Sequence, residues 1–155
     1  KLVVARPKHL TATDLDSLSN IFTLIGQNIN SAHGLEVATT PSKHSLRTKN
    51  IIAVGTPEQN NLIKKNNSRL YFKFAKNFAK FTSNEKLSVE DDWGQHIGTV
   101  QLLRSPYNNK RAFLVATAVQ PRYIYLATQQ LASAKNVEQY QNKDAFVVDE
   151  DNVST

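Results

Sequence analysis

Hydrophobic residues follow the chain in runs that alternate between the spacing of strands and the spacing of helices. Residues 1–5 (KLVVA) and 51–55 (IIAVG) are continuous apolar runs, which predict strands that are buried on both faces of a sheet. Residues 35–39 (LEVAT) predict another strand between them. Five apolar residues spaced three or four apart predict one face of an amphipathic helix: Leu15, Leu18, Phe22, Ile25 and Ile29.

The second half of the chain predicts a hairpin, a helix and a last strand. Residues 97–118 contain two apolar strands separated by a turn at 105–109, and residues 121–134 predict a helix that begins with proline. Residues 145–149 (AFVVD) predict the last strand, and a polar tail follows. Residues 69–81 (RLYFKFAKNFAKF) fit both a helix face and the alternation of a strand, so their structure stays open at this point.

Strands that alternate with helices predict a three-layer α/β domain with a doubly wound, mostly parallel sheet of the flavodoxin-like kind. The hairpin spacing favours one antiparallel pair within this sheet. The 155 residues suit one domain, residues 1–155. Because the sequence opens on Lys1 and contains no methionine, we expect this domain to be a piece of a longer protein. Any targeting segment or membrane anchor would then lie outside it.

Composition narrows the class of function. Cysteine is absent, which excludes disulfides, thiol nucleophiles and cysteine-ligated metals. The net charge of +6 allows an anionic partner. The basic residues are scattered except for one group, which is more typical of a solvated face. Tyr71-Phe72-Lys73-Phe74 interleaves aromatic and basic residues, but no recognition module surrounds it, so nucleic acid is not an expected partner. The basic group consists of Lys64, Lys65, Arg69, Lys73, Lys76 and Lys80.

The corner after residues 51–55 is the first candidate phosphate site. Gly55 is followed by Thr56 as a possible cap and Pro57 at a first helical position, which predicts a short helix as far as Ile63. A phosphate-binding loop requires Gly-Lys-Ser/Thr at this place. Here Pro57 lacks an amide donor and Glu58 repels an anion, so the residues favour a structural turn.

The corner after residues 1–5 is the second candidate. Thr11 and Thr13 supply hydroxyl groups ahead of a helix, as the flavin-phosphate loop of flavodoxins does. The glycine of such loops is missing, and Asp14 and Asp16 lie where a phosphate would bind. Helix capping by the two threonines is therefore the favoured interpretation. A ligand-binding domain for FMN, or for a nucleotide such as cyclic di-GMP, remains the alternative.

The remaining candidates for chemistry are isolated. None of the four histidines has the spacing of a zinc helix. The neighbouring carboxylates of Asp91 and Asp92 tend to point apart, and no serine lies in a Gly-x-Ser-x-Gly turn. We therefore expect no catalytic, cofactor or metal site, and no enzyme. Trp93, in a polar loop, either stacks on a sugar or plugs the end of the sheet. The histidines are His9, His33, His44 and His96.

Three stretches, in order along the chain, together resemble the family of regulatory accessory subunits of bacterial cellulose synthase. Residues 55–60 (GTPEQN) are similar to that family's Gly-Thr-Pro-x-x-Asn segment after an apolar strand. Residues 98–117 resemble its segment in which a Ser-Pro-aromatic turn precedes an apolar strand. Residues 142–149 resemble its terminal strand, with Lys143 in place of the glycine. The aromatic residue of the turn is Tyr107 rather than tryptophan.

The resemblance implies a non-catalytic domain of an accessory, regulatory subunit that is extracytoplasmic and anchored to the membrane through segments outside this chain. Such a subunit supports synthesis and export of β-1,4-glucan or a related biofilm exopolysaccharide. Its implied partners are the catalytic glycosyltransferase subunit and the glucan polymer, and no cofactor is implied. Direct glucan binding through Trp93 or Tyr107 is a further alternative. The resemblance marks seven residues as structural or interaction positions: Gly55, Thr56, Pro57, Asn60, Ser105, Pro106 and Tyr107.

Overall fold

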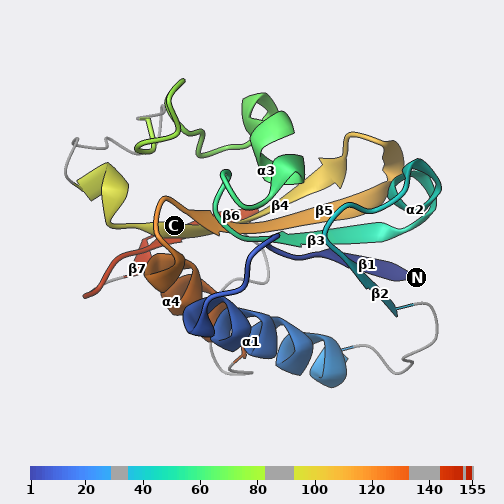
Figure 1. Cartoon of the computed structure of the whole chain (residues 1–155), viewed down its shortest axis with the longest axis horizontal. Coiled ribbons are helices and arrows are strands. Elements are labelled where there is room, and N and C mark those ends of the chain that lie inside the picture. The colour runs from blue at the N-terminus through green and yellow to red at the C-terminus, as the bar shows by residue number, and fades with distance from the viewer. Residues whose placement is uncertain (29–34, 83–92, 133–143, 152, 155) are drawn as a thin grey trace.

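The chain forms a mixed α/β domain built on one seven-stranded sheet (Figure 1). The computed structural model describes residues 1–28, 35–82, 93–132, 144–151 and 153–154. The strand order across the sheet is β2-β1-β3-β5-β4-β6-β7. The strands are β1 (Leu2–Ala5), β2 (Leu35–Ala38), β3 (Asn50–Val54), β4 (Gly98–Ser105), β5 (Asn108–Ala118), β6 (Ala145–Val148) and β7 (Val153–Ser154).

The sheet is mostly parallel in strand direction. Neighbours β2-β1, β1-β3 and β3-β5 are parallel, whereas β4 is antiparallel to both β5 and β6, and β7 is antiparallel to β6. The predicted hairpin is confirmed as β4 and β5. The sequence predicted one antiparallel pair, whereas the described residues form three. The reason is that β4 inserts between β5 and β6 and the polar tail adds β7.

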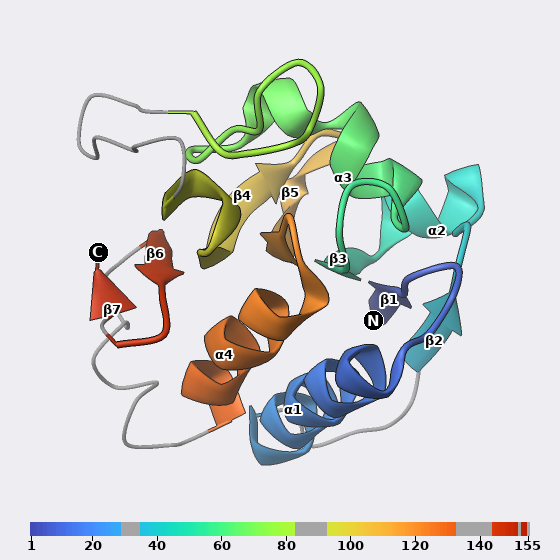
Figure 2. The same cartoon turned by 60° about the vertical axis from the view of Figure 1, so that its left-hand side comes forward.

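Helices lie on both sides of the sheet, which gives three layers (Figures 1 and 2). Helices α1 (Ala12–Asn28) and α4 (Pro121–Ala132) pack on each other and cover one face. Helices α2 (Lys43–Thr48) and α3 (Asn61–Lys65) lie on the other. Helix α2 was missed, because residues 41–50 are almost entirely polar.

Strands β1 and β3 contribute side chains to both layers of the core, as their continuous apolar runs predicted. Val3 and Ile51 belong to the core beneath α2 and α3, whereas Val4 and Ile52 belong to the core beneath α1 and α4. All four are buried. The predicted strands 1–5 and 51–55 are thus confirmed, and so is the expected helix that begins at Pro121.

The buried face of α1 agrees with the predicted one only in part, since Leu18 is buried in the core as expected. Leu15 and Phe22, which were assigned to the core, are 54% and 38% exposed. The other buried residues of this helix include Asp14, Ser17 and Ile21. Two of these three are polar, so a search for apolar periodicity chooses a stripe rotated around the helix from the real one.

Residues 69–81 are neither a helix nor a regular strand. After a short 3₁₀ turn, η1 (Asn67–Arg69), the chain forms a loop closed by an isolated bridge between Phe74 and Phe81. The two phenyl rings stack with centroids 4.2 Å apart and are buried in the core beneath α2 and α3. Phe78, between them, has a positive φ of 57°, which neither regular element allows.

Gln101, a buried residue of β4, holds the start of this loop. Its Oε1 accepts from the backbone N–H of Tyr71 at 2.7 Å and of Phe72 at 3.1 Å, and its Nε2 donates to the carbonyl of Phe72 at 3.1 Å. A side-chain amide thus supplies the partners that a neighbouring strand would otherwise provide. This anchor lies about thirty residues away in sequence, which local periodicity does not report.

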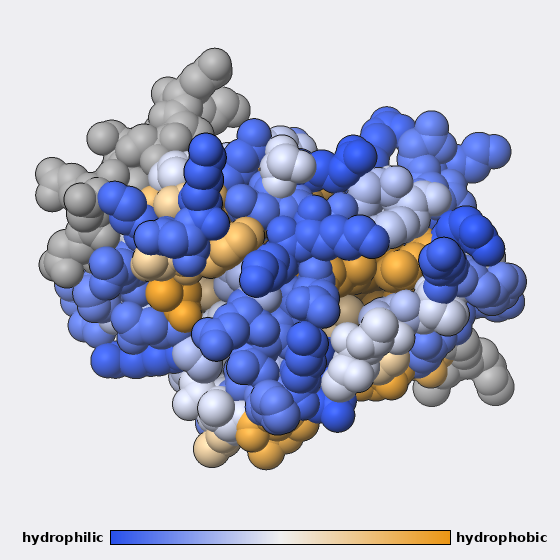
Figure 3. Space-filling model, turned by 45° about the horizontal axis from the view of Figure 1, so that its top comes forward, coloured by the Kyte–Doolittle hydropathy of each residue, from blue (hydrophilic) through white to orange (hydrophobic). Residues whose placement is uncertain are grey.

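The surface on the side of α2 and α3 is largely hydrophilic, with small apolar patches between the polar side chains (Figure 3). No helix within the described part of the chain is both long and apolar enough to cross a membrane.

Candidate functional site

The corner after β3 is a tight turn and not the start of a helix. Gly55 has a backbone φ of 139°, which residues with a side chain rarely adopt. Thr56 opens a turn, because its carbonyl accepts from the backbone N–H of Gln59 at 3.1 Å and of Asn60 at 2.9 Å. Helix α3 begins only at Asn61, so the predicted helix start at Pro57 was wrong.

Asn60 is the centre of this corner. It is 1% exposed, and its Nδ2 donates to the carbonyl of Ala5, at the end of β1, and to that of Val54, at the end of β3, both at 3.0 Å. Its Oδ1 accepts from the N–H of Leu62 at 3.1 Å and so caps α3. One side chain therefore joins two strands and a helix.

The space between the ends of β1 and β3 is filled by the chain itself. Pro7, Thr56 and Pro57 are buried there, and the loops are joined by a hydrogen bond from the N–H of Lys8 to the carbonyl of Gln59 at 2.9 Å. Doubly wound proteins bind ligands outside the carboxyl ends of their strands, where the strand order reverses. Here that crevice is packed with side chains. The backbone amides that a phosphate would need instead form hydrogen bonds within the turn.

The second corner is closed by a capping box at the start of α1. The Oγ1 of Thr11 accepts from the N–H of Asp14, and the carboxylate of Asp14 accepts from both the N–H and the hydroxyl of Thr11, all at 3.0 Å. The protein's own carboxylate therefore takes the position that favours an anion at a helix N-terminus. Thr11 is a cap as predicted, whereas Thr13 lies inside the helix.

The Ser105-Pro106-Tyr107 turn contacts the α2 and α3 side of the sheet. The N–H of Tyr107 donates to Oγ of Ser105 at 3.2 Å, and the hydroxyl of Tyr107 accepts from Nδ2 of Asn66 at 3.0 Å. Tyr107 is half-buried against the core beneath these helices. Its polar group is therefore used to hold the hairpin to the end of α3.

Trp93 lies in a 3₁₀ turn, η2 (Trp93–Gln95), just before β4. Its ring is half-buried against the core beneath α2 and α3, and its Nε1 donates to Oδ2 of Asp149 at 3.0 Å. An indole held by an internal acceptor at one end and by the core at the other has the arrangement of a plug.

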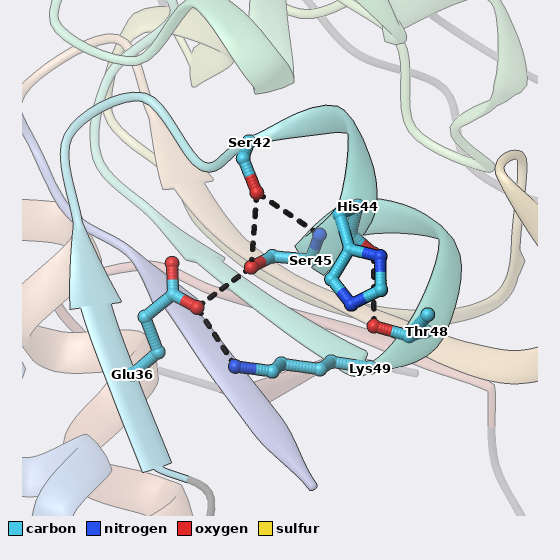
Figure 4. A network of polar contacts seen from close by, with 6 residues as sticks. All are labelled: Glu36, Ser42, His44, Ser45, Thr48 and Lys49. Atoms are coloured by element: carbon cyan, nitrogen blue, oxygen red, sulfur yellow. Dashed lines mark hydrogen bonds and ion pairs between the residues drawn. The ribbon is translucent and has the colours of Figure 1, made fainter.

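A polar network joins β2 to α2 (Figure 4). Ser42 caps α2, and Oγ of Ser45 donates to Oε1 of Glu36 at 2.7 Å. Nζ of Lys49 forms an ion pair with the same oxygen at 2.8 Å. These hydrogen bonds, that of Lys49 first and that of Ser45 second, hold the pKa of Glu36 below its ordinary value. The network carries a serine, a carboxylate and a lysine, but the hydroxyl donates to the carboxylate, so the arrangement is that of a structural staple.

The histidines and neighbouring acids do not assemble within the described residues. His44 contributes its backbone carbonyl to Thr48, and the ring of His96 packs edge-on against Tyr123. No group of three or more potential metal ligands occurs in the described ranges. Five of the residues considered in the sequence lie outside these ranges: Ile29, His33, Asp91, Asp92 and Lys143.

Sequence reasoning missed the partners that give the motif residues their roles. Asn66, Gln101 and Asp149 pair with segments 29 to 56 positions away, and only residue type hinted at them, since buried amides and carboxylates need partners. The chain matches no protein-family model and no curated protein sequence.

Proposed function

We propose that this chain is a non-catalytic structural and interaction domain of the accessory subunit of a bacterial cellulose synthase complex. The observation that carries the proposal is the inward use of the polar groups in the motif. Asn60 joins β1, β3 and α3, and Tyr107 holds the hairpin to Asn66. Motif residues that fix loops suit a domain whose function depends on the shape of its surface.

The strand order supports a flavodoxin-like fold as the finer description. The strands that share one direction follow the order β2-β1-β3-β5-β6, which corresponds to the flavodoxin order 2-1-3-4-5. In this description β4 is an insertion between the last two of these strands, and β7 extends the edge. The filled corners support a flavodoxin-like domain without a phosphate site at these positions.

The wider context belongs to the same proposal. The domain would be one part of an extracytoplasmic protein held at the membrane by segments outside residues 1–155. Its partner would be the catalytic glycosyltransferase subunit, and its role would be to support synthesis and export of β-1,4-glucan or a related polymer.

Capture by the catalytic subunit tests this proposal. The purified chain is immobilised and exposed to the detergent-solubilised glycosyltransferase subunit, with a flavodoxin of similar size as the control. We expect saturable capture by this chain and not by the control, and absence of capture would overturn the proposal. Titration calorimetry with FMN and cyclic di-GMP is the second arm. Saturable binding of either ligand would favour a ligand-binding domain instead.

A further inference from the structure

A groove lies at the opposite end of the sheet from the filled corners, where β3 and β5 begin and β4 ends. It has a volume of about 790 Å³, within the usual range for ligand sites. Its lining includes an aromatic ring, a large aliphatic side chain, three cations and one carboxylate: Tyr71, Leu102, Arg104, Lys110, Arg111 and Asp144.

Part of the floor of this groove is the face of the β4-β5 hairpin. Leu102 and Arg104 are alternate residues of β4 and therefore point to the same side of the sheet. Leu102 is opposite Leu114, which packs on the core beneath α1 and α4, so this part of the floor lies on that face. A ligand lying there would meet mainly side chains.

Two large apolar side chains of the groove are held partly in solvent. Leu102 is 44% exposed and Tyr71 is 45% exposed. The backbone of Tyr71 is fixed by the bond from its N–H to Gln101, so its side chain projects from an anchored position. A ring and an aliphatic chain on a rigid base provide contact area for the apolar face of a flat ligand.

The charge of the groove is unbalanced. Arg104, Lys110 and Arg111 meet one carboxylate, that of Asp144, and none of the three cations forms an ion pair within the part of the chain that the structure describes. Elsewhere Lys49 pairs with Glu36 and Arg122 with Glu150. Guanidinium groups bind carboxylates and phosphates through two parallel hydrogen bonds, so the groove complements an anion.

We propose that this groove binds an anionic saccharide chain. The sugar rings lie against Tyr71 and Leu102, and carboxylate or phosphate substituents pair with Arg104 and Lys110, which share the face of Leu102. This inference rests on the proposed function, which places the domain beside an exopolysaccharide, and it makes that polymer acidic rather than plain glucan. An acidic peptide is the less favoured occupant, because the partly exposed side chains of Tyr71 and Leu102 suit the apolar face of a sugar ring.

Titration calorimetry and amide chemical-shift mapping on the whole chain test the inference. The probes are an oligoglucuronate, a phosphorylated gluco-oligosaccharide, a neutral cello-oligosaccharide and an oligoglutamate of matched length. We expect binding of at least one acidic saccharide, with shifts at residues 102–112 and Tyr71. Raising the salt from about 50 mM to about 300 mM should weaken this binding, because exposed charges are screened. The first two probes distinguish carboxylate from phosphate as the anion.

A matched pair of double variants separates the groove from general charge. R104Q/K110Q should weaken binding by about tenfold or more, because the charge-assisted hydrogen bonds to the anion are lost. K65Q/R69Q removes the same two charges from exposed positions in α3 and η1 and should leave affinity unchanged. All four residues project at the surface, so thermal melts should show both variants folded.

Four results would overturn the inference: equal loss in both double variants, equal affinity for the neutral saccharide, equal affinity for oligoglutamate, or shifts confined to another surface. No binding of either acidic saccharide would do the same. The proposed function is judged separately by capture of the glycosyltransferase subunit. Capture without saccharide binding would reject only the groove, whereas saccharide binding without capture would reject the accessory-subunit assignment.

Discussion

Replacing Asn60 with alanine is the most direct perturbation of this fold. The change removes two hydrogen bonds of 3.0 Å to the carbonyls of Ala5 and Val54, and the 3.1 Å cap on the N–H of Leu62. A hydrogen bond contributes about 0.5–1.5 kcal/mol net, and a buried group left without a partner costs about 1–3 kcal/mol. We therefore expect Asn60→Ala to lower the free energy of unfolding by about 3–5 kcal/mol.

Urea denaturation followed by circular dichroism measures this loss, with the slope of the transition as a check on two-state behaviour. For a chain of this length the melting temperature should fall by about 6–20 °C. The matched control is Asn61→Ala, one position further on, where the residue is exposed and the cost should stay within about 0.5 kcal/mol. If the two variants differed by less than about 1 kcal/mol, the assignment of Asn60 as the link between β1, β3 and α3 would be wrong.

A third variant separates the cap from the strand link. Asn60→Asp keeps an oxygen for the N–H of Leu62 but turns a second oxygen toward the two carbonyls. It should be at least as destabilising as Asn60→Ala at neutral pH. Burial and the facing carbonyls raise the pKa of the new carboxyl group in the folded state. Stability should therefore recover as the pH falls, because the protonated group donates one hydrogen bond. A pH-independent loss would contradict this account.

Three other changes test separate parts of the structure. Phe22→Ala should cost less than about 1 kcal/mol, because the ring is partly exposed, whereas Phe81→Ala should cost about 3–5 kcal/mol; denaturation midpoints that put them in the opposite order would reject the rotation of α1. Gly55→Ala should destabilise the chain by about 1–3 kcal/mol because of its φ of 139°, and an unchanged melting temperature would refute the strain. The pKa of Glu36 is lowered in the folded state, so its pairing with Lys49 stabilises the protein above the ordinary value of 4.5 and is lost as the pH falls below it. The difference in unfolding free energy between the wild type and Glu36→Gln should be about 1 kcal/mol or less at neutral pH and should shrink in acid. A difference that stays constant with pH would rule out this titration.

The elements that the sequence predicted well are those whose burial pattern is local. A run such as 51–55 has no polar face, so it indicates a strand covered on both sides wherever that strand lies in the sheet. The β4-β5 hairpin is similarly local, because its turn and its partner strands are adjacent in sequence. The closed corners were also predictable in part, since Pro57 and Asp14 each carry a local reason against a bound phosphate.

The groove could not be predicted in the same way. Its lining comes from four segments that are far apart in sequence: Asn50 of β3, the loop around Tyr71, the β4-β5 hairpin and Asp144. In the sequence the basic residues are concentrated at 64–80, away from Arg104 and Lys110. The pairing of β4 with β5 and with β6, and the bond from Tyr71 to Gln101, bring these segments to one place.

The sequence by itself determined the α/β class, the order of most strands and helices along the chain, and the residues unsuited to phosphate binding. These properties follow from hydrophobic periodicity and from the chemistry of single residues, which act over a few positions. Only the tertiary structure decided which side of α1 faces the sheet, where α3 begins, and how residues 69–81 fold. The last two depend on a buried polar group and its partners: Asn60 with Ala5, and Gln101 with Phe72. On α1, Asp14 is buried and bonds to Thr11. Hydropathy counts such groups as surface, because their burial becomes favourable only when the fold supplies a hydrogen-bonding partner.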